Sequence, residues 1–178
     1  SKMEEVLKRL EKLLRELEEY VERNERENRK LLEELEDYVR RNEKRNKEIL
    51  EELRDVVRRR SPREDLRRKL EEAHKENRKS IEDLRRKLER IHERNKRSVE
   101  ELRKRLDEIK KEVDELRRDG VSDEELRKAL ERLRRVVEKV EDISRELDDR
   151  LRRVVEKAEE ISRRLDEEIK EVVDRAEK

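Results

Sequence analysis

Cysteine, tryptophan and phenylalanine are absent from the 178-residue sequence, and glycine, proline and methionine each occur once. Without cysteine, the chain has no disulfide framework and no thiol chemistry. The longest apolar runs are pairs such as Leu13–Leu14 and Val56–Val57, which are too short for a signal peptide or a membrane span. We therefore expect a soluble protein without a targeting signal, which is consistent with cytoplasmic recombinant expression.

An excess of charge of one sign is also lacking, because 55 basic residues face 54 acidic ones and the net charge is +1. A nucleic-acid-binding protein would show a basic excess on one face. A membrane-surface helix would carry bulky aromatic residues and basic flanks. The composition thus argues against nucleic acid and membranes as partners. With 61% charged residues, the chain is either disordered or built from long helices.

What the sequence has in abundance is repetition, with an eighteen-residue period. Eighteen residues are about five turns of an α-helix, so a side chain returns to the same face with almost no angular drift. This period favours long and nearly straight helices over disorder. Three polar sets recur at this spacing: Tyr20, Asn24 and Asn28 as Tyr38, Asn42 and Asn46; His74, Asn77 and Ser80 as His92, Asn95 and Ser98; Ser144 and Asp148 as Ser162 and Asp166.

Only two places interrupt the helical pattern. At the first, Ser61 is a natural N-cap, Pro62 suits the first helical position, and Glu64 completes a capping box. At the second, Gly120 can end a helix in the left-handed conformation, and Ser122 can cap the next helix. The sequence therefore contains three helices, at about 2–60, 62–119 and 123–177.

Short connections force neighbouring helices to run antiparallel. The predicted fold class is all-α, an antiparallel up-down-up three-helix bundle of long, nearly straight helices, with residues 1–178 in a single domain. Each helix carries an apolar stripe that can bury one face, and the stripe of the second helix includes Ile81, Leu84 and Ile91. This width suits a monomer that requires no partner, although a homo-oligomer is possible.

The polar repeats lie on these apolar stripes. Because the turns are short, the chain reverses direction at each one, and residues equally far from a turn lie at equal height. For the first two helices the numbers of two such residues add up to about 122. For the last two helices they add up to about 240. Asn24 and Ser98 meet the first condition, and His92 and Asp148 meet the second. A third copy of the layer, near the start of the first helix, is apolar. The polar side chains of all three helices are therefore expected to converge at two heights.

We predict that these side chains form two buried hydrogen-bond networks. A buried polar group without a partner costs about 1–3 kcal/mol, so such groups must come in complete sets. A shifted helix would leave donors opposite leucine, and the networks would therefore specify the helix register. The first network contains Tyr20, Asn24, Asn28, His92, Asn95, Ser98, Ser144 and Asp148, and the second Tyr38, Asn42, Asn46, His74, Asn77, Ser80, Ser162 and Asp166.

Serine, histidine and aspartate at each height raise three chemical alternatives. Straight helices offer no strained turn, oxyanion donors or pocket for a catalytic triad, so we predict that the protein is not an enzyme. One histidine and one aspartate in each layer make a poor metal site, so we expect no metal and no cofactor. Buried His74 and His92 could make stability depend on pH between about 5 and 7.

Capping residues at the helix starts, a Glu/Lys/Arg surface, copied core layers and paired polar layers resemble those of a computationally designed protein. The whole chain is similar to de novo designed straight three-helix bundles with buried hydrogen-bond networks. Natural spectrin-like repeats usually carry a core tryptophan, which is missing here. The resemblance implies a structural scaffold without natural activity. The alternative is an interaction module that self-associates, or that is cut at its turns into separately associating helices.

Overall fold

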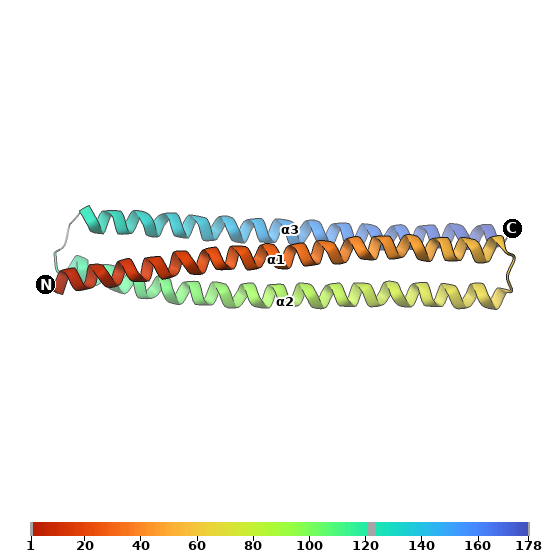
Figure 1. Ribbon diagram of the computed structural model, residues 1–178, viewed down its shortest axis with the longest axis horizontal. Helices are drawn as coiled ribbons and strands as arrows, with labels where there is room; N and C mark the ends of the chain where they lie inside the picture. The colour runs from red at the N-terminus through yellow and green to blue at the C-terminus, as the bar shows by residue number, and fades with distance from the viewer. Residues whose placement is uncertain (1, 121–123, 178) are drawn as a thin grey trace. The chain divides into compact units, whose positions relative to one another are not determined.

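The structure is a computed structural model that describes residues 2–120 and 124–177, which are almost entirely α-helical. Helix α1 spans Lys2–Arg58, α2 spans Arg63–Arg118 and α3 spans Glu124–Ala176. Figure 1 shows each of them as an uninterrupted ribbon. Within the described ranges no residue is in a strand. The predicted three-helix bundle is confirmed, and each observed helix end lies close to the predicted one.

Contacts divide the chain into two compact units, and each unit contains one segment of every helix. Unit 1 comprises residues 1–30 and 91–148, and unit 2 comprises residues 31–90 and 149–178. The first predicted polar set falls entirely in unit 1 and the second entirely in unit 2. All three helices continue from one unit into the other. A single domain therefore stays a prediction.

In unit 1, α1 runs antiparallel to α2 and parallel to α3. Arg9 pairs with Glu112, and Glu27 pairs with Arg94, so the partner's number falls as the α1 number rises. The two α1–α3 pairs of unit 1, Glu18–Arg132 and Glu25–Lys139, are both separated by 114 residues, so these helices run parallel. Unit 2 shows the same two patterns, in Arg45–Glu76 and Glu52–Lys69 for α1–α2 and in Glu36–Arg150 and Arg54–Glu168 for α1–α3. The connectivity is therefore up-down-up within each unit.

The core of unit 1 includes the apolar layer near the start of α1, where Val6 and Leu10 are each 1% exposed. Leu14, Leu17 and Ile109 are completely buried. Burial of such a side chain contributes about 1.5–3 kcal/mol, so these layers stabilise the packing of the unit. The buried members of this core are Val6, Leu7, Leu10, Leu14, Leu17, Val21, Leu102, Ile109, Val113, Leu116, Leu126, Ala129 and Val136.

A core cluster of unit 2 contains Ile49, Leu50, Leu53, Ala73, Leu165, Ile169 and Val172. One residue of the predicted α2 stripe does not belong to the core, because Ile81 is 39% exposed. At about 100° per residue, Ile81 lies roughly 60–80° around the helix from the buried Leu84 and Ala73. The prediction that Ile81 belongs to the core is wrong, because the buried side chains of α2 lie to one side of it on the helix surface.

The end of α1 differs from the sequence expectation. Arg60 has a φ of 50°, in the left-handed region, and the N–H groups of Arg60 and Ser61 donate to the carbonyl groups of Val57 and Val56. These two hydrogen bonds form a Schellman motif, in which glycine is the usual left-handed residue. Arginine therefore occupies a conformation that costs an L-amino acid roughly 1–2 kcal/mol.

The start of α2 also differs in detail. The carbonyl of Pro62 accepts hydrogen bonds from the N–H groups of Asp65 and Leu66. Within residues 4–120, Ser61 and Glu64 are not hydrogen-bonded to each other, so the predicted capping box is not formed. At the second turn, Gly120 has a φ of 74°, as expected for a residue that ends a helix. The predicted cap at Ser122 lies outside the described residues.

Candidate functional site: polar layers between the helices

In unit 1, the amides and hydroxyls of the predicted polar layer lie close together. The hydroxyl of Ser98 on α2 donates to Oδ1 of Asn24 on α1 at 3.3 Å. Asn28, Asn95 and Ser144 line the same small cavity of about 20 Å³. A cavity needs about 10–15 Å³ to hold one water molecule. The layer therefore combines one direct α1–α2 hydrogen bond with space for a single bridging water.

In unit 2, the equivalent layer uses other pairs. The Nδ2 amide of Asn77 on α2 donates to the hydroxyl of Ser162 on α3 at 3.2 Å. The Tyr38 hydroxyl on α1 is 3.5 Å from the carbonyl oxygen of Ser80 and 3.4 Å from Oδ2 of Asp83. Each helix is therefore joined to a neighbour by at least one polar side chain at this height.

The contacts of Tyr38 change its acidity. Partial burial raises the pKa of the Tyr38 hydroxyl above its ordinary value, and the charge of Asp83 adds to this rise. The hydrogen bond with Asn42 on the same helix acts in the opposite direction. The neutral phenol is therefore the form that the fold favours, and its single O–H can donate to either neighbouring acceptor.

Four side chains of the predicted networks are not buried: His74, His92, Asp148 and Asp166 are exposed. Each directly follows a buried core residue, as His92 follows Ile91 and Asp148 follows Leu147. Consecutive helical residues point about 100° apart, so these four side chains lie beside the apolar stripe. The prediction that they are buried is wrong. The other twelve predicted members are partly buried, and no polar side chain among the described residues is fully buried.

The exposure of the two histidines also removes the premise of pH sensing. That alternative required imidazole groups shielded from water, and both His74 and His92 are exposed. Within residues 4–120 and 124–177, no group of three His, Cys, Asp or Glu side chains could hold a metal ion. The layers can therefore form hydrogen bonds and ion pairs, but these residues offer no ligand set for a metal.

A cation covers each tyrosine ring. The guanidinium of Arg105 lies 4.7 Å from the centre of the Tyr20 ring in unit 1. The ammonium group of Lys87 lies 5.0 Å from the centre of the Tyr38 ring in unit 2. Arg105 and Lys87 are one repeat apart on α2, so the same α1–α2 contact occurs in both units. Such cation–π contacts stabilise by about 0.5–1 kcal/mol at exposed sites.

Ion pairs between helices also repeat, and the sequence interpretation missed them. Arg132 on α3 donates to Glu18 on α1 at 2.8 Å in unit 1, and Arg150 donates to Glu36 at 2.9 Å in unit 2. The two pairs are one repeat apart on both helices. The signal was available, because the charged residues beside the apolar stripes follow the same eighteen-residue period as the polar sets.

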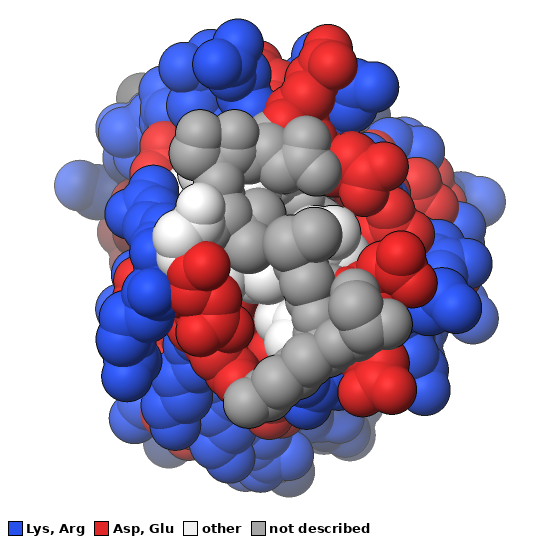
Figure 2. Space-filling view, turned by 90° about the vertical axis from the view of Figure 1, so that its left-hand side faces the viewer, with Lys and Arg blue, Asp and Glu red and all other residues white. Residues whose placement is uncertain are grey.

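Four further ion pairs join α1 to α2: one is Glu52–Lys69 at 3.5 Å, and the other three are spaced by one repeat. Arg9 lies 3.8 Å from Glu112, Glu27 pairs with Arg94, and Arg45 lies 3.0 Å from Glu76. The hydrogen bond to Glu76 raises the pKa of the Arg45 guanidinium above its ordinary value. Figure 2 shows basic and acidic side chains around the whole periphery of one face. These pairs are therefore specific contacts within a surface of mixed charge.

Comparison with known protein families, with curated proteins and with solved structures found no match to this chain. In the described part of the chain, no helix is both long and apolar enough to cross a membrane. The functional assignment therefore depends on the interhelical contacts themselves. Of these contacts, the cation–π contacts and the α1–α3 ion pairs recur after one repeat, whereas the amide and hydroxyl hydrogen bonds differ between the units.

Proposed function

We propose that the protein is a designed structural scaffold without natural biochemical activity, in which polar side chains between the helices specify helix register. The observation that carries this proposal is the recurrence of interhelical contacts after one repeat. The Glu18–Arg132 and Glu36–Arg150 hydrogen bonds have nearly the same length, at 2.8 and 2.9 Å. Copied sequence units that form copied contacts are typical of an idealised backbone. The proposal includes no catalysis, cofactor or required partner.

The role in register follows from the energetics of polar groups. Leucine-rich stripes pack almost equally well after a shift of one turn, because apolar contacts have little directionality. A hydrogen bond such as Ser98–Asn24 is lost after the same shift, and its partly buried groups then face apolar side chains. An unpaired buried donor or acceptor costs about 1–3 kcal/mol. Partly buried pairs contribute less than this, but several of them act together.

Removal of one polar layer tests the proposal. The turn between α1 and α2 is cleaved between Arg60 and Ser61 after folding, so that α1 can move. We expect that replacing Asn24, Asn28, Asn95 and Ser98 by apolar residues in this cleaved chain keeps the helices but produces more than one register. Two-dimensional NMR would then show extra amide signals, since each register gives its own set. The matched control replaces the equivalent side chains of the other unit, Asn42, Asn46, Asn77 and Ser80, and should give the same result. A single set of signals and an unshifted structure in both variants would contradict the proposal.

Self-association is the second candidate function, and one exposed side chain bears on it. Ile81 is the one exposed large hydrophobic residue among those described. Single exposed apolar side chains are normal on monomers and do not indicate an interface. We therefore expect sedimentation equilibrium to give the mass of one chain, 22.2 kDa. A concentration-dependent mass that falls in Ile81→Lys would favour the interaction module instead.

A further inference from the structure

The polar layers leave one register ambiguity, because they themselves recur with the eighteen-residue period. If α2 is shifted by one repeat along α1, the layer of Asn24 meets the layer of Ser80 in place of Ser98. One polar layer then still faces another polar layer, so part of the hydrogen bonding is kept. The polar layers alone therefore discriminate less strongly against a shift of one repeat than against a shift of one turn. Another feature is needed to exclude this register.

Three of the four α1–α2 ion pairs have this property, and the fourth, Glu52–Lys69, lies outside their series. On α1, positions 9, 27 and 45 are one repeat apart and carry Arg, Glu and Arg. Their partners on α2, at positions 112, 94 and 76, carry Glu, Arg and Glu. The side chains of the middle pair are 43% and 42% exposed, so they are only partly screened by water. Charge therefore alternates along α1, while all three native pairs stay attractive.

We propose that these three pairs form an alternating charge code between α1 and α2, and that Glu27 and Arg94 determine its specificity. A shift of one repeat brings Arg9 opposite Arg94 and Glu27 opposite Glu76, so both overlapping pairs become repulsive. The opposite shift likewise produces one Glu–Glu and one Arg–Arg pair. This inference rests on the proposed function, since it adds a second device to register specification.

The α1–α3 contacts provide a comparison within the same molecule. Along α1, the residues that pair with α3 at a spacing of one repeat are negatively charged, negatively charged and positively charged. A shift of one repeat therefore leaves one attractive and one repulsive pair. The code between α1 and α2 is therefore the more discriminating of the two. The α1–α3 pairs spaced by one repeat are Glu18–Arg132, Glu36–Arg150 and Arg54–Glu168, and Glu25–Lys139 lies outside this series.

The variant that tests the code is the double exchange Glu27→Arg with Arg94→Glu. It keeps the composition, the net charge and three attractive pairs in the native register. It removes the alternation, because α1 then carries arginine at all three positions. A shift of one repeat now meets two attractive pairs in place of two repulsive ones. An exposed pair changes an equilibrium about twofold when an attraction is gained and about twofold when a repulsion is lost. With two pairs, the ratio of shifted to native register should rise on the order of tenfold.

The measurement needs a complete chain in which α1 can move. A protease site inserted between Arg60 and Ser61 and cleaved after folding keeps all residues in one complex. Because the chain lacks cysteine, Glu11→Cys and Lys110→Cys provide two exposed sites for spin labels on α1 and α2. A shift of one repeat moves a label by roughly 27 Å, at about 1.5 Å per residue. Double electron–electron resonance then measures the ratio of shifted to native register.

We expect one short distance in the parent complex and a long-distance population in the exchanged variant. The matched control exchanges Glu93→Arg and Arg97→Glu, an exposed pair within α2 at 3.5 Å, and should match the parent. An unchanged ratio of the two registers in the Glu27/Arg94 variant would overturn the charge code. The charge code would also be overturned if none of the complexes showed the long distance.

The same assay separates this inference from the proposed function. In a third complex, Asn24→Leu and Ser98→Leu remove a polar pair while all charges stay in place. The polar layers act against a shift of one turn, so their loss should displace the label distance by about 5 Å, whereas loss of the charge code displaces it by about 27 Å. A one-turn displacement in this complex, without a one-repeat population in the Glu27/Arg94 variant, would reject the charge code and keep the role of the polar layers. A one-repeat population in the Glu27/Arg94 variant, without a one-turn displacement in this complex, would support the charge code and contradict the role of the polar layers.

Discussion

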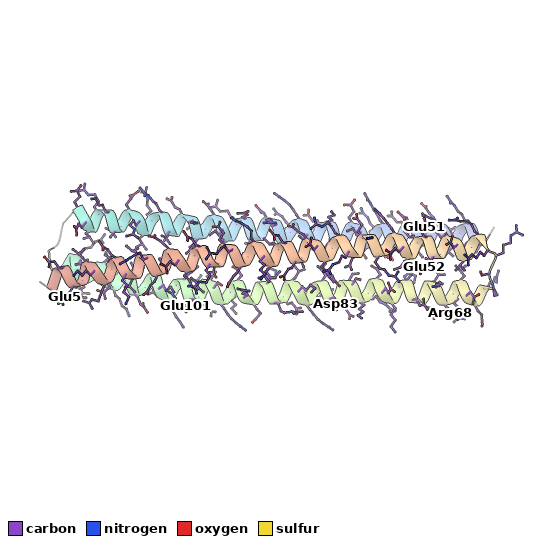
Figure 3. All side chains as sticks on the ribbon, in the orientation of Figure 1. Glu5, Glu51, Glu52, Arg68, Asp83 and Glu101 are labelled. Carbon is purple, nitrogen blue, oxygen red and sulfur yellow. The ribbon has the colours of Figure 1, made fainter. Side chains whose placement is uncertain are left out.

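Unit 1 and unit 2 carry a tyrosine at equivalent positions of α1, but the carboxylates beside them behave differently. In unit 2, Asp83 accepts a hydrogen bond from Tyr38. Its equivalent in unit 1 is Glu101, whose carboxylate lies 3.3 Å from Arg105 on the same helix. Both carboxylates are labelled on α2 in Figure 3. Asp83 also lies 4.0 Å from Arg86 on its own helix, so the contact with the tyrosine hydroxyl is what distinguishes it from Glu101.

The amide layers show the same kind of divergence. Unit 1 has the Asn24–Ser98 hydrogen bond between α1 and α2, whereas unit 2 has the Asn77–Ser162 hydrogen bond between α2 and α3. The two units have the same residue types at these positions. Amides and hydroxyls both donate and accept, so several pairings are nearly equal in energy. Equal sequences therefore fix the height of a polar layer more firmly than its internal pairing.

The two units differ in the size of one buried side chain on α2, and a single substitution makes them equal. Ile91 in unit 1 is equivalent to Ala73 in unit 2, and both are buried. We expect Ile91→Ala to lower the free energy of unfolding by about 2–5 kcal/mol, because it leaves a cavity. Urea denaturation measures this loss. The exposed Ile81→Ala should cost less than about 1 kcal/mol, and equal losses at the two sites would contradict the observed core.

The two helix ends with left-handed residues should respond with opposite signs. Gly120→Ala should lower the free energy of unfolding by about 1–2 kcal/mol, since the left-handed conformation is strained for alanine. An added Cβ there meets no atom within 4 Å, so this loss is conformational. Arg60→Gly should raise stability by roughly 0.5–1 kcal/mol, because the relief exceeds the added chain entropy. Thermal unfolding of both variants tests this, and changes of the same sign would refute it.

The contribution of Tyr38 to stability should depend on pH in the alkaline range. Because the folded pKa of Tyr38 is raised, its contribution to stability is complete below the unfolded pKa of about 10. That contribution is lost as the pH rises through the folded pKa. Tyr38→Phe should cost about 0.5–1.5 kcal/mol at neutral pH and remove this part of the alkaline loss. Tyr20→Phe is the matched control and should leave the alkaline loss that is due to Tyr38 unchanged. Unfolding titrations from neutral to alkaline pH compare the variants.

The smallest effect concerns the two α1–α3 ion pairs. Double-mutant cycles on Glu18–Arg132 and Glu36–Arg150 should each give a coupling of about 0.2–1 kcal/mol. The unit 2 pair should couple slightly more strongly, since its side chains are 35% and 26% exposed against 37% for both partners in unit 1. Both couplings should weaken at high salt. A coupling in one unit only would show that repeated geometry does not imply repeated energy.

The sequence was sufficient to predict the helices and the heights at which their polar residues meet. Pro62 and Gly120 end the periodic pattern, and they lie in the two turns. The short turns then fix which residues are level, as the Ser98–Asn24 contact illustrates. These features depend on chain geometry, which the eighteen-residue period and the turn positions define.

Burial and partner choice were less predictable. A repeat copies exposed residues as faithfully as core residues, so recurrence alone did not separate His92 from Asn95. Their positions differ by the angle around the helix, and the apolar stripe reached Ile91 but not its neighbour. The ion pairs lie beside the apolar stripes, so the polar repeats on the stripes do not reveal them. Reading the signs of charge at the same period would have revealed Arg9, Glu27 and Arg45.

The constant separation of 114 residues between α1 and α3 partners in both units has a practical consequence. The two helices advance by equal amounts over a repeat, so no mismatch accumulates between them. One extra copy of the repeat, inserted into each of the three helices, would preserve both turns and every existing neighbour. The bundle can therefore be lengthened in whole repeats without the redesign of any contact.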